Sequence, residues 1–206
     1  MEVVPRRLLV LGGGSAGVEL AQVVRRLGGD AVIVEGADYV LPREPTALGA
    51  ALGDALRGDG IELVLGMHAT GARRKGNQYV LVFDDGRQLR GDRLLVATGR
   101  RTRVERIGLE TVGIEPNPSG IRVDDHLRAG EGLWAIGDVN GFWPLTHVGE
   151  YEADVVAANI AGDPRPANYE AVPRVTYTDP QAAAVGALDA AYTGTASWTG
   201  RGRSDR

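Results

Sequence analysis

Residues 8–35 read LLVLGGGSAGVELAQVVRRLGGDAVIVE, and this stretch predicts the fold. An apolar run is followed by a glycine-rich turn, an amphipathic segment, a second apolar run and a terminal acid. A βαβ unit that holds a dinucleotide has its parts in this order. The pattern Gly12-x-Gly14-x-x-Gly17 has the spacing of the dinucleotide-binding fingerprint. We therefore expect an α/β fold with a Rossmann-like, NAD(P)-binding domain built on a parallel sheet.

Each glycine of this pattern has its own physical role. Gly12 permits a sharp turn out of the first strand. Gly14 has no side chain that would hold a pyrophosphate away from the backbone N–H groups, and Gly17 lets the following helix pack close to the strands. That helix is expected to begin near Ala16, directly after Ser15. Its unpaired N–H groups and positive dipole end would then face the phosphates.

Glu35 ends the second apolar run, 18 residues after Gly17. A carboxylate at this place can accept hydrogen bonds from both hydroxyls of the adenosine ribose, and it would repel a 2′-phosphate. NAD(H) is therefore favoured over NADP(H), with Arg43 as the one nearby cation that could support NADP(H). The alternative is a glycine-rich surface turn followed by a solvated glutamate.

Composition excludes several classes of function. The 206 residues carry a net charge of −4, which gives a nucleic-acid partner no electrostatic support. No apolar run approaches the length of a membrane span, and no signal-peptide pattern is present, so we expect a cytoplasmic protein. The sequence contains no cysteine, which excludes thiolate catalysis and cysteine-ligated metals within it. The three histidines form no metal-spacing cluster, and no metal site is expected.

Three amphipathic segments predict helices, each with an inner apolar stripe. The first follows the glycine turn and ends at Gly28-Gly29, the second has Thr46 as its N-cap, and the third spans residues 149–160. The expected inner residues are Leu20, Val23, Val24 and Leu27 in the first, Leu48, Leu52, Ala55 and Leu56 in the second, and Ala153, Val156, Ala157 and Ile160 in the third.

Short apolar runs between turn residues predict the strands. Residues 61–65 and 93–97 are expected to continue the parallel sheet. Between them, residues 72–75, 78–83 and 88–89 are separated by tight polar turns, which indicates an antiparallel meander in place of a crossover helix. Gly99 follows the last of these strands, so we expect it at the same sheet edge as Gly14.

The second half of the chain has a looser texture, with a domain boundary near residue 101. Residues 133–136 predict a buried strand that leads into Gly137 and Asp138. The acid could bind a sugar or polyol hydroxyl, or it could simply occupy a turn or cap a helix. Residues 174–178 predict a last strand, and residues 187–206 show no periodicity, so we expect a disordered tail.

Five segments together resemble the pyridine nucleotide-disulfide oxidoreductase family, in the family's order. They read GGGSAGVE (12–19), ATGR (97–100), AIGDV (135–139), LTHV (145–148) and VPRVTYTDP (172–180). The resemblance covers roughly residues 5 to 186. It implies an NAD(P)-binding domain over residues 1–100, the C-terminal part of a FAD-binding domain over 101–163, and the start of a dimerisation domain over 164–186.

The resemblance also assigns roles to single residues. It implies that Asp138, next to Gly137, bonds the ribitol of FAD, and that the backbone of Thr146 and His147 faces the flavin. It places Gly99 beside the nicotinamide cofactor. Glu19 matches an acid on the nicotinamide side, which relatives pair with a lysine; from the sequence alone it could be a helix acid favoured by the dipole.

The sequence also departs from the family's pattern. The family's own FAD-binding glycine motif, its Cys-x4-Cys redox pair and its His-Glu base are not found, so no catalytic residue is assigned. Ser15 stands where an aromatic residue often gates the nicotinamide pocket. We therefore expect a fragment of a FAD-dependent oxidoreductase that is inactive alone, and that forms a homodimer or joins a partner chain carrying the missing FAD segment. The alternatives are a non-catalytic NAD(H)-binding module and a non-functional truncation.

Overall fold

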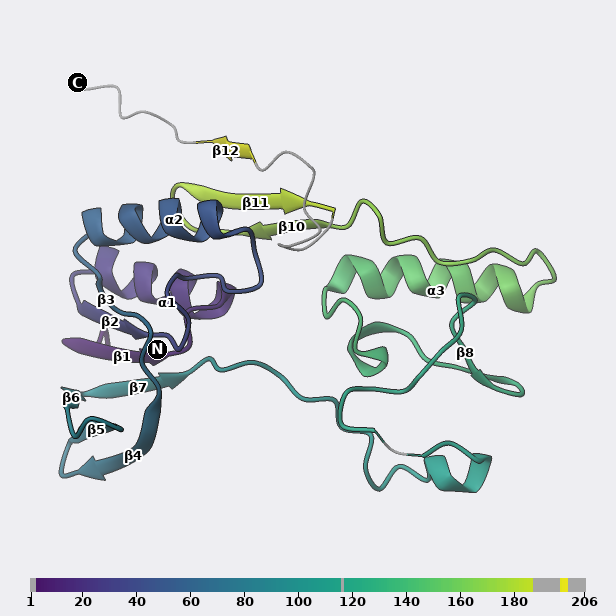
Figure 1. Ribbon diagram of the computed structural model, residues 1–206, viewed down its shortest axis with the longest axis horizontal. Coiled ribbons are helices and arrows are strands. Elements are labelled where there is room, and N and C mark those ends of the chain that lie inside the picture. Colours follow the sequence, from purple (N-terminus) through teal and green to yellow (C-terminus); the bar gives the residue numbers. More distant parts are fainter. Residues whose placement is uncertain (1–2, 116, 187–196, 200–206) are drawn as a thin grey trace. The chain divides into compact units, whose positions relative to one another are not determined.

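The computed structural model describes residues 3–115, 117–186 and 197–199. The chain divides into two compact units (Figure 1). Unit 1 comprises residues 1–99 together with 173–206, and unit 2 comprises residues 100–172. Each unit is described by itself below.

Unit 1 is built on a four-stranded parallel sheet with the strand order β3-β2-β1-β7. Two helices lie in the β1–β2 and β2–β3 connections, which confirms the predicted α/β, Rossmann-like class. The third predicted strand is a short edge strand rather than a buried one, since Glu62 is exposed. The elements are β1 (Arg7–Leu11), α1 (Ser15–Arg26), β2 (Asp30–Val34), α2 (Thr46–Gly58), β3 (Glu62–Val64) and β7 (Arg93–Val96).

Alternate side chains of β1 enter two separate cores. Leu8 and Val10 pack with the helices, whereas Leu9 packs with the antiparallel meander on the opposite face. The meander is confirmed, and it buries Leu81 and Phe83 against the parallel sheet. Because both faces are covered, β2 is apolar at four consecutive positions rather than alternating. The meander strands are β4 (Ala69–Lys75), β5 (Gln78–Phe83) and β6 (Gln88–Gly91).

The predicted inner stripe of α1 is wrong at three of its four positions. Leu20, Val23 and Leu27 are 43%, 48% and 60% exposed, and of the four only Val24 is buried. The helix instead turns Gly17, Ala21 and Val24 inward, at helical spacing. The physical reason is that Gly17 must face the sheet for the helix to approach it closely, and this fixes the rotation of the whole helix.

The second helix follows its prediction more closely. Leu48, Leu52 and Leu56 are buried as expected. Thr46 is the first helical residue rather than the N-cap, because Pro45 holds the N-cap position and no side-chain cap bond forms. Proline suits this place because its fixed backbone angle and missing N–H are tolerated at a helix start.

The C-terminal part of unit 1 is an antiparallel arrangement of β10 (Pro173–Thr176), β11 (Gln181–Val185) and β12 (Ser197–Thr199). The sequence predicted only one strand here. Ala182 and Ala184 of β11 enter the same core as the helices. Apart from β12, the predicted disordered tail lies outside the described residues.

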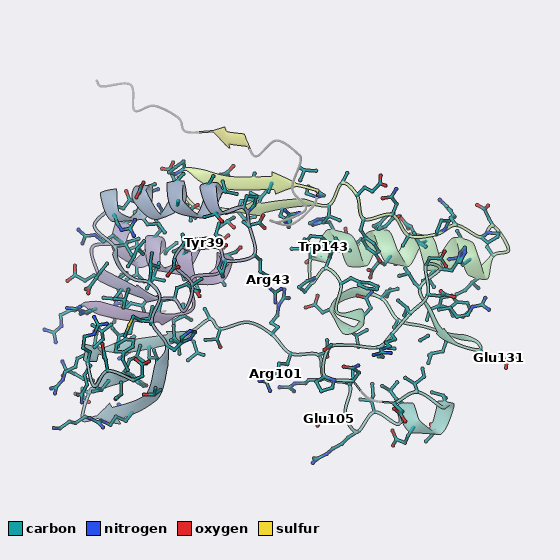
Figure 2. All side chains as sticks on the ribbon, viewed as in Figure 1. Tyr39, Arg43, Arg101, Glu105, Glu131 and Trp143 are labelled. Carbon is teal, nitrogen blue, oxygen red and sulfur yellow. The ribbon has the colours of Figure 1, made fainter. Side chains whose placement is uncertain are left out.

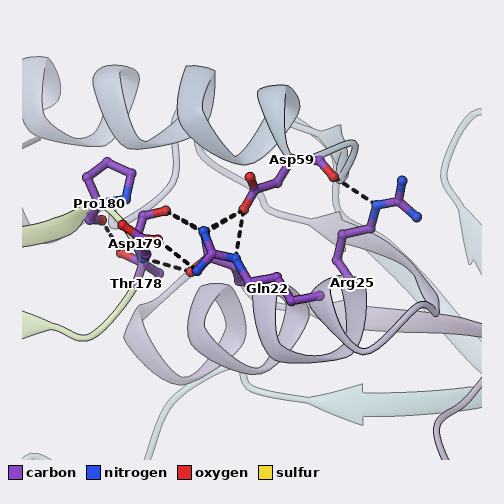
Figure 3. A network of polar contacts seen from close by, with 7 residues as sticks. Gln22, Arg25, Asp59, Thr178, Asp179 and Pro180 are labelled. Atoms are coloured by element: carbon purple, nitrogen blue, oxygen red, sulfur yellow. Dashed lines mark hydrogen bonds and ion pairs between the residues drawn. The ribbon is translucent and has the colours of Figure 1, made fainter. Parts of the chain in front are cut away.

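One face of α1 forms a polar stripe that holds the β10–β11 hairpin. The stripe consists of Ser15, Glu19, Gln22 and Arg26. Gln22 is 4% exposed; its amide donates to Asp179 O and Asp59 Oδ2 and accepts from Asp179 N, each at 2.8 Å (Figure 3). Arg26 donates to the carboxylate and carbonyl oxygens of Asp179. Burial lowers the pKa of Arg26, but the hydrogen bonds and negative charges of Asp179 and Asp59 outweigh it, so the pKa is raised above its ordinary value.

Unit 2 contains one long helix, which contacts the η2 turn, and a small core of its own. Val104, Leu109, Ile121 and Ala135 form that core. The predicted strand over residues 133–136 is shorter than expected, since only two of those residues pair. The elements are η1 (Leu109–Val112), β8 (Arg128–Gly130), β9 (Leu133–Trp134), η2 (Gly137–Asn140) and α3 (Thr146–Ile160).

The predicted inner face of α3 is wrong. Ala153 and Ala157 are exposed, Ile160 is 62% exposed and Val156 is half-buried. The helix begins three residues before Gly149, and its buried residues are Val148, Glu152, Val155 and Ala158. The apolar pattern predicts the wrong face because the centre of the buried face is a carboxylate, that of Glu152. Its hydrogen bonds offset the cost of burying it.

Membrane spans and metal clusters are both absent from the described part of the chain. No helix within residues 3–115, 117–186 and 197–199 is long and apolar enough to cross a membrane. The same residues contain no group of three or more histidine and acidic side chains arranged to hold a metal ion.

The ion pair between Arg174 and Glu44 is expected to stabilise unit 1. Both side chains are largely buried, at 8% and 15% exposure, and the guanidinium contacts both carboxylate oxygens at 2.8 and 3.0 Å. Glu44→Gln leaves a buried charge without its full partner, so it should lower the free energy of unfolding by about 2–4 kcal/mol in denaturant titrations. The matched control is Glu62→Gln, which breaks an exposed ion pair with Arg7. It should change the free energy of unfolding by less than about 1 kcal/mol. Equal small effects would contradict the prediction.

Gln22 is expected to hold the hairpin on α1. Gln22→Ala removes three hydrogen bonds and leaves Asp179 N without the acceptor it has on Gln22, while Asp179 O keeps its bond from Arg26. The free energy of unfolding should therefore fall by about 1–2 kcal/mol. Amide exchange over residues 173–185 should also accelerate. Val23→Ala, on the exposed side of the same helix, should leave both measurements nearly unchanged. Unchanged exchange in the hairpin of the Gln22 variant would rule out this role.

Candidate functional site

The glycine loop between β1 and α1 is shaped by two close backbone approaches. Gly12 has φ +109°, and a Cβ there would collide with the carbonyl oxygen of Ala97 at the end of β7. A Cβ at Gly17 would collide with the carbonyl oxygen of Gly12 and would lie 3.3 Å from Val10 Cγ1. Gly14 differs, because a Cβ there would meet no atom within 4 Å. Packing therefore requires glycine at positions 12 and 17, whereas position 14 faces open space.

The N-terminus of α1 faces this open space. Its first turn is closed by a hydrogen bond from Val18 N to Gly14 O at 3.0 Å. The N–H groups of Ser15, Ala16 and Gly17 precede this bond and have no acceptor within the helix. The first turn carries no acidic residue. The combination of these N–H groups, the dipole and the room above Gly14 is suited to an anion such as a pyrophosphate.

Glu35 lies at the carboxyl end of β2, beside the glycine loop. Its carboxylate accepts hydrogen bonds from Gly13 N at 2.7 Å and from Ala37 N at 2.9 Å. The side chain is half-buried, so it is not the solvated glutamate of the alternative interpretation. Each carboxylate oxygen has a second lone pair, so Glu35 can accept further hydrogen bonds from a ribose.

Arg43 lies closer to the glycine loop than its position in the sequence suggests. The segment between β2 and α2 folds back, and Leu41 N donates to Gly13 O at 2.8 Å. Arg43 follows two residues later with an exposed side chain (Figure 2). The segment that carries Arg43 is therefore fastened to the glycine loop two residues before Arg43.

Gly99 follows β7 at the same edge of the sheet. Strand β7 pairs with β1, and Ala97 N donates to Leu11 O at 2.7 Å. Gly99 has φ +113°, and a Cβ there would meet no atom within 4 Å. The structure thus brings together, at the carboxyl edge of the parallel sheet, the predicted site residues Gly12, Gly14, Ala16, Gly17, Glu35 and Gly99.

The side chains of Ser15 and Glu19 contact the hairpin. The hydroxyl oxygens of Ser15 and Thr176 lie 2.8 Å apart, and Glu19 Oε1 accepts a hydrogen bond from Tyr177 N at 2.7 Å. Both residues were predicted as cofactor residues. In this structure they are the N-terminal half of the polar stripe that holds β10.

The remaining predicted residues form a second group in unit 2. Gly137 has φ +71° and begins the η2 turn, and Asp138 follows it with a half-exposed carboxylate. Thr146 and His147 begin α3. A Cβ on Gly149 would lie 3.5 Å from Gly137 Cα, so the first turn of α3 lies against η2. The acid and the helix N-terminus are therefore neighbours.

Sequence reasoning missed two residues of this second group. Arg100 donates to Asp138 Oδ2 at 2.7 Å and to Pro144 O at 2.5 Å. Glu152 is completely buried and accepts a hydrogen bond from Gly137 N. The signal for Glu152 was available, because an acid at spacing i, i+4, i+7 with Val148 and Val155 interrupts an apolar helical stripe.

An open depression at the C-terminal end of α1 is a weaker candidate. It is lined by Arg25, Arg26, Gly28, Asp59 and Asp179. Its arginines are already paired, Arg25 with Asp30 and Arg26 with the two aspartates. The depression therefore offers no uncompensated positive charge to an anion.

Comparison with known proteins agrees with the resemblance in the sequence. Residues 1–154 match the family described as pyridine nucleotide-disulphide oxidoreductase. The chain is 36% identical over 183 residues to a dihydrolipoyl dehydrogenase of Pseudomonas aeruginosa, an alignment that covers 88% of this chain and 39% of that protein. It is 35% identical over 194 residues to the dihydrolipoyl dehydrogenase of Corynebacterium glutamicum, with 89% and 41% covered.

Solved structures show the same fold. LpdA from Mycobacterium tuberculosis superposes with a TM-score of 0.85 at 28% identity, over 91% of this chain and 42% of that one. The HOCl-induced flavoprotein disulfide reductase RclA from Escherichia coli gives a TM-score of 0.83 at 28% identity, with 92% and 44% covered. The chain spans about two fifths of the length of these relatives. It belongs to the pyridine nucleotide-disulphide oxidoreductase family.

Proposed function

We propose that unit 1 is the NAD(H)-binding portion of a FAD-dependent oxidoreductase. The observation that carries this proposal is the contrast among the three glycines. Positions 12 and 17 are filled by neighbouring backbone, whereas position 14 opens onto free space at the N-terminus of α1. A dinucleotide pyrophosphate needs such a cradle. When bound, the nicotinamide supplies a hydride and the flavin of such an enzyme accepts it.

The chain's own residues would bind and orient the dinucleotide. The first N–H groups of α1 would hold the pyrophosphate. Glu35 would accept hydrogen bonds from the adenosine ribose while it keeps its bond to Gly13 N. Gly99 leaves room at the same sheet edge for the nicotinamide half. A 2′-phosphate would meet the Glu35 carboxylate, so we expect NAD(H) to be preferred to NADP(H), with the exposed Arg43 as the counteracting cation.

For unit 2 we propose a part of the FAD-binding domain. Asp138 presents a half-exposed carboxylate beside the N-terminus of α3, an arrangement suited to a polyol hydroxyl at the carboxylate and to negative charge on a ligand at the helix end. The sequence contains no cysteine. These residues therefore supply no redox thiol of their own, and the electron acceptor of the whole protein is not specified by them.

A second candidate is a module that binds NAD(H) without turning it over. The observation that favours it is that all the proposed contacts of unit 1 bind or orient, and none of them is a nucleophile or a base. The two candidates differ in one measurement. The oxidoreductase retains flavin and bleaches it with NADH, whereas the binding module shows saturable NADH binding without flavin. Purified protein that binds neither cofactor would leave only the truncation hypothesis.

Substitutions at two glycines should separate binding from folding. Gly14→Ala places a methyl group in open space on a backbone with φ −71°, so the unfolding midpoint should change little. The methyl would occupy the pyrophosphate cradle, and NADH affinity, measured by nucleotide fluorescence, should fall at least tenfold. Gly17→Ala collides with Gly12 O and should destabilise the fold itself by several kcal/mol. Intact NADH binding in Gly14→Ala would refute the cradle.

The preference for NADH should depend on Glu35. The intact chain should bind NADH at least tenfold more tightly than NADPH. Glu35→Gln removes the negative charge and should reduce this ratio several-fold, whereas Arg43→Ala should weaken only NADPH. These affinities are measured by calorimetric titration, with Glu62→Gln, which changes an exposed acid on β3, as the matched control. A chain that prefers NADPH would overturn the role given to Glu35.

A further inference from the structure

Glu152 is a carboxylate completely enclosed by unit 2. Its exposure is 0%, and it lies in the middle of α3 between the buried residues Val148 and Val155. Acids are almost never buried in this way unless they are paired, because removing the charge from water is costly. The hydrogen-bond partners of Glu152 therefore show what it is retained for.

Two of its three donors come from the turn that carries Asp138. Glu152 Oε2 accepts from Gly137 N at 2.5 Å, and Oε1 accepts from Asn140 Nδ2 at 2.9 Å. Asn140 Oδ1 in turn accepts from Phe142 N at 3.0 Å. Gly137 and Asn140 are the first and last residues of η2. The carboxylate thus fastens both ends of the turn to the helix.

The third donor to Glu152 comes from a residue that follows α3 in the sequence. Tyr169 Oη donates to Glu152 Oε1 at 2.7 Å. The Tyr169 ring lies 5.7 Å from that of Phe142, measured between ring centroids. Burial and this bond to Glu152 raise the pKa of Tyr169 above its ordinary value. Tyr169 therefore bonds to the same carboxylate oxygen as Asn140, but its hydroxyl hydrogen bond goes to Glu152 and not to the backbone of the turn.

We propose that Glu152 is a positioning residue that fixes the η2 turn and so sets the direction in which Asp138 presents its carboxylate. Asp138 itself faces outward to Arg100, at 2.7 Å, and is left accessible. The inference rests on the proposed role of unit 2 in binding FAD. Glutamine could not replace Glu152 without losing hydrogen bonds. Three donors point at the two carboxylate oxygens, and the NH2 group of an amide would face at least one of these donors.

The experiment uses the 206-residue chain and two independent measurements. Hydrogen–deuterium exchange over residues 137–142 reports the turn, and quenching of flavin fluorescence reports FAD affinity. Glu152→Gln should accelerate exchange of the Gly137 amide at least tenfold, because the amide loses its carboxylate acceptor. It should also lower the pKa of Tyr169, followed by phenolate absorbance, because the negative charge beside the phenol is removed. Tyr169→Phe is the matched control, because it removes one hydrogen bond of the same carboxylate and identifies the Tyr169 absorbance signal. Exchange rates in the turn of this variant should stay within about threefold of those of the unsubstituted chain.

A double-mutant cycle tests whether Glu152 acts through Asp138. Glu152→Gln and Asp138→Asn should each weaken FAD binding about tenfold, and the double variant should be no weaker than Asp138→Asn alone. Additive losses, or unchanged exchange in Glu152→Gln, would overturn the proposal.

If Glu152→Gln does not fold, Asn140→Ala replaces it, because it detaches one end of the turn and should accelerate exchange over residues 138–142. Absence of FAD binding by the unsubstituted chain would refute the role of unit 2, while the exchange measurement would still decide the role of Glu152.

Discussion

The close approach of α1 to the parallel sheet is the constraint on which unit 1 depends. It exists because Gly17 has no side chain where the Gly12 carbonyl lies. With that contact made, the helix cannot rotate, since a larger residue at the contact would lift it away from β1. The rotation then points the helix N-terminus into the space above Gly14. It also decides which residues of α1 face the hairpin and which face outward.

The polar stripe of α1 is a consequence of that rotation. Ser15, Glu19, Gln22 and Arg26 recur at helical spacing, and each bonds to the hairpin segment 176–179. Ser15 and Glu19, which the sequence predicts as cofactor residues, therefore also take part in an internal contact through their side chains. The same helix thus offers its backbone N–H groups at one end to the proposed dinucleotide and its polar side chains along one face to the hairpin.

Local patterns predicted the backbone of this protein better than its packing. The parallel strands, the meander and the glycine turn follow from apolar runs and turn residues, which are local signals. The buried faces of α1 and α3 do not. In both helices a polar residue, Gln22 or Glu152, occupies an inner position, because partners distant in the sequence satisfy its hydrogen bonds. Counting apolar residues gave the wrong face in each case. Of the proposed site, the residues at strand ends and helix starts could be found from the sequence. Glu152 left only the signal of an acid within an apolar helical stripe, and Arg100 could be found only through its contacts.

Both candidate sites use an acid in the same physical way. Glu35 holds Gly13 N, and Glu152 holds Gly137 N, so in each unit a carboxylate accepts the backbone N–H of a glycine in the turn that would face a cofactor. A glycine-containing turn is flexible by itself, since glycine restricts the backbone least. A charge-assisted hydrogen bond to its N–H removes that freedom before any ligand arrives. The ordering entropy is then lost on folding rather than on binding, and this favours a tight and well-oriented complex. The two acids differ in exposure. Glu35 is half-buried and can also bond to the proposed ligand, whereas Glu152 is completely buried, so the proposed ligand contact in unit 2 is made by Asp138.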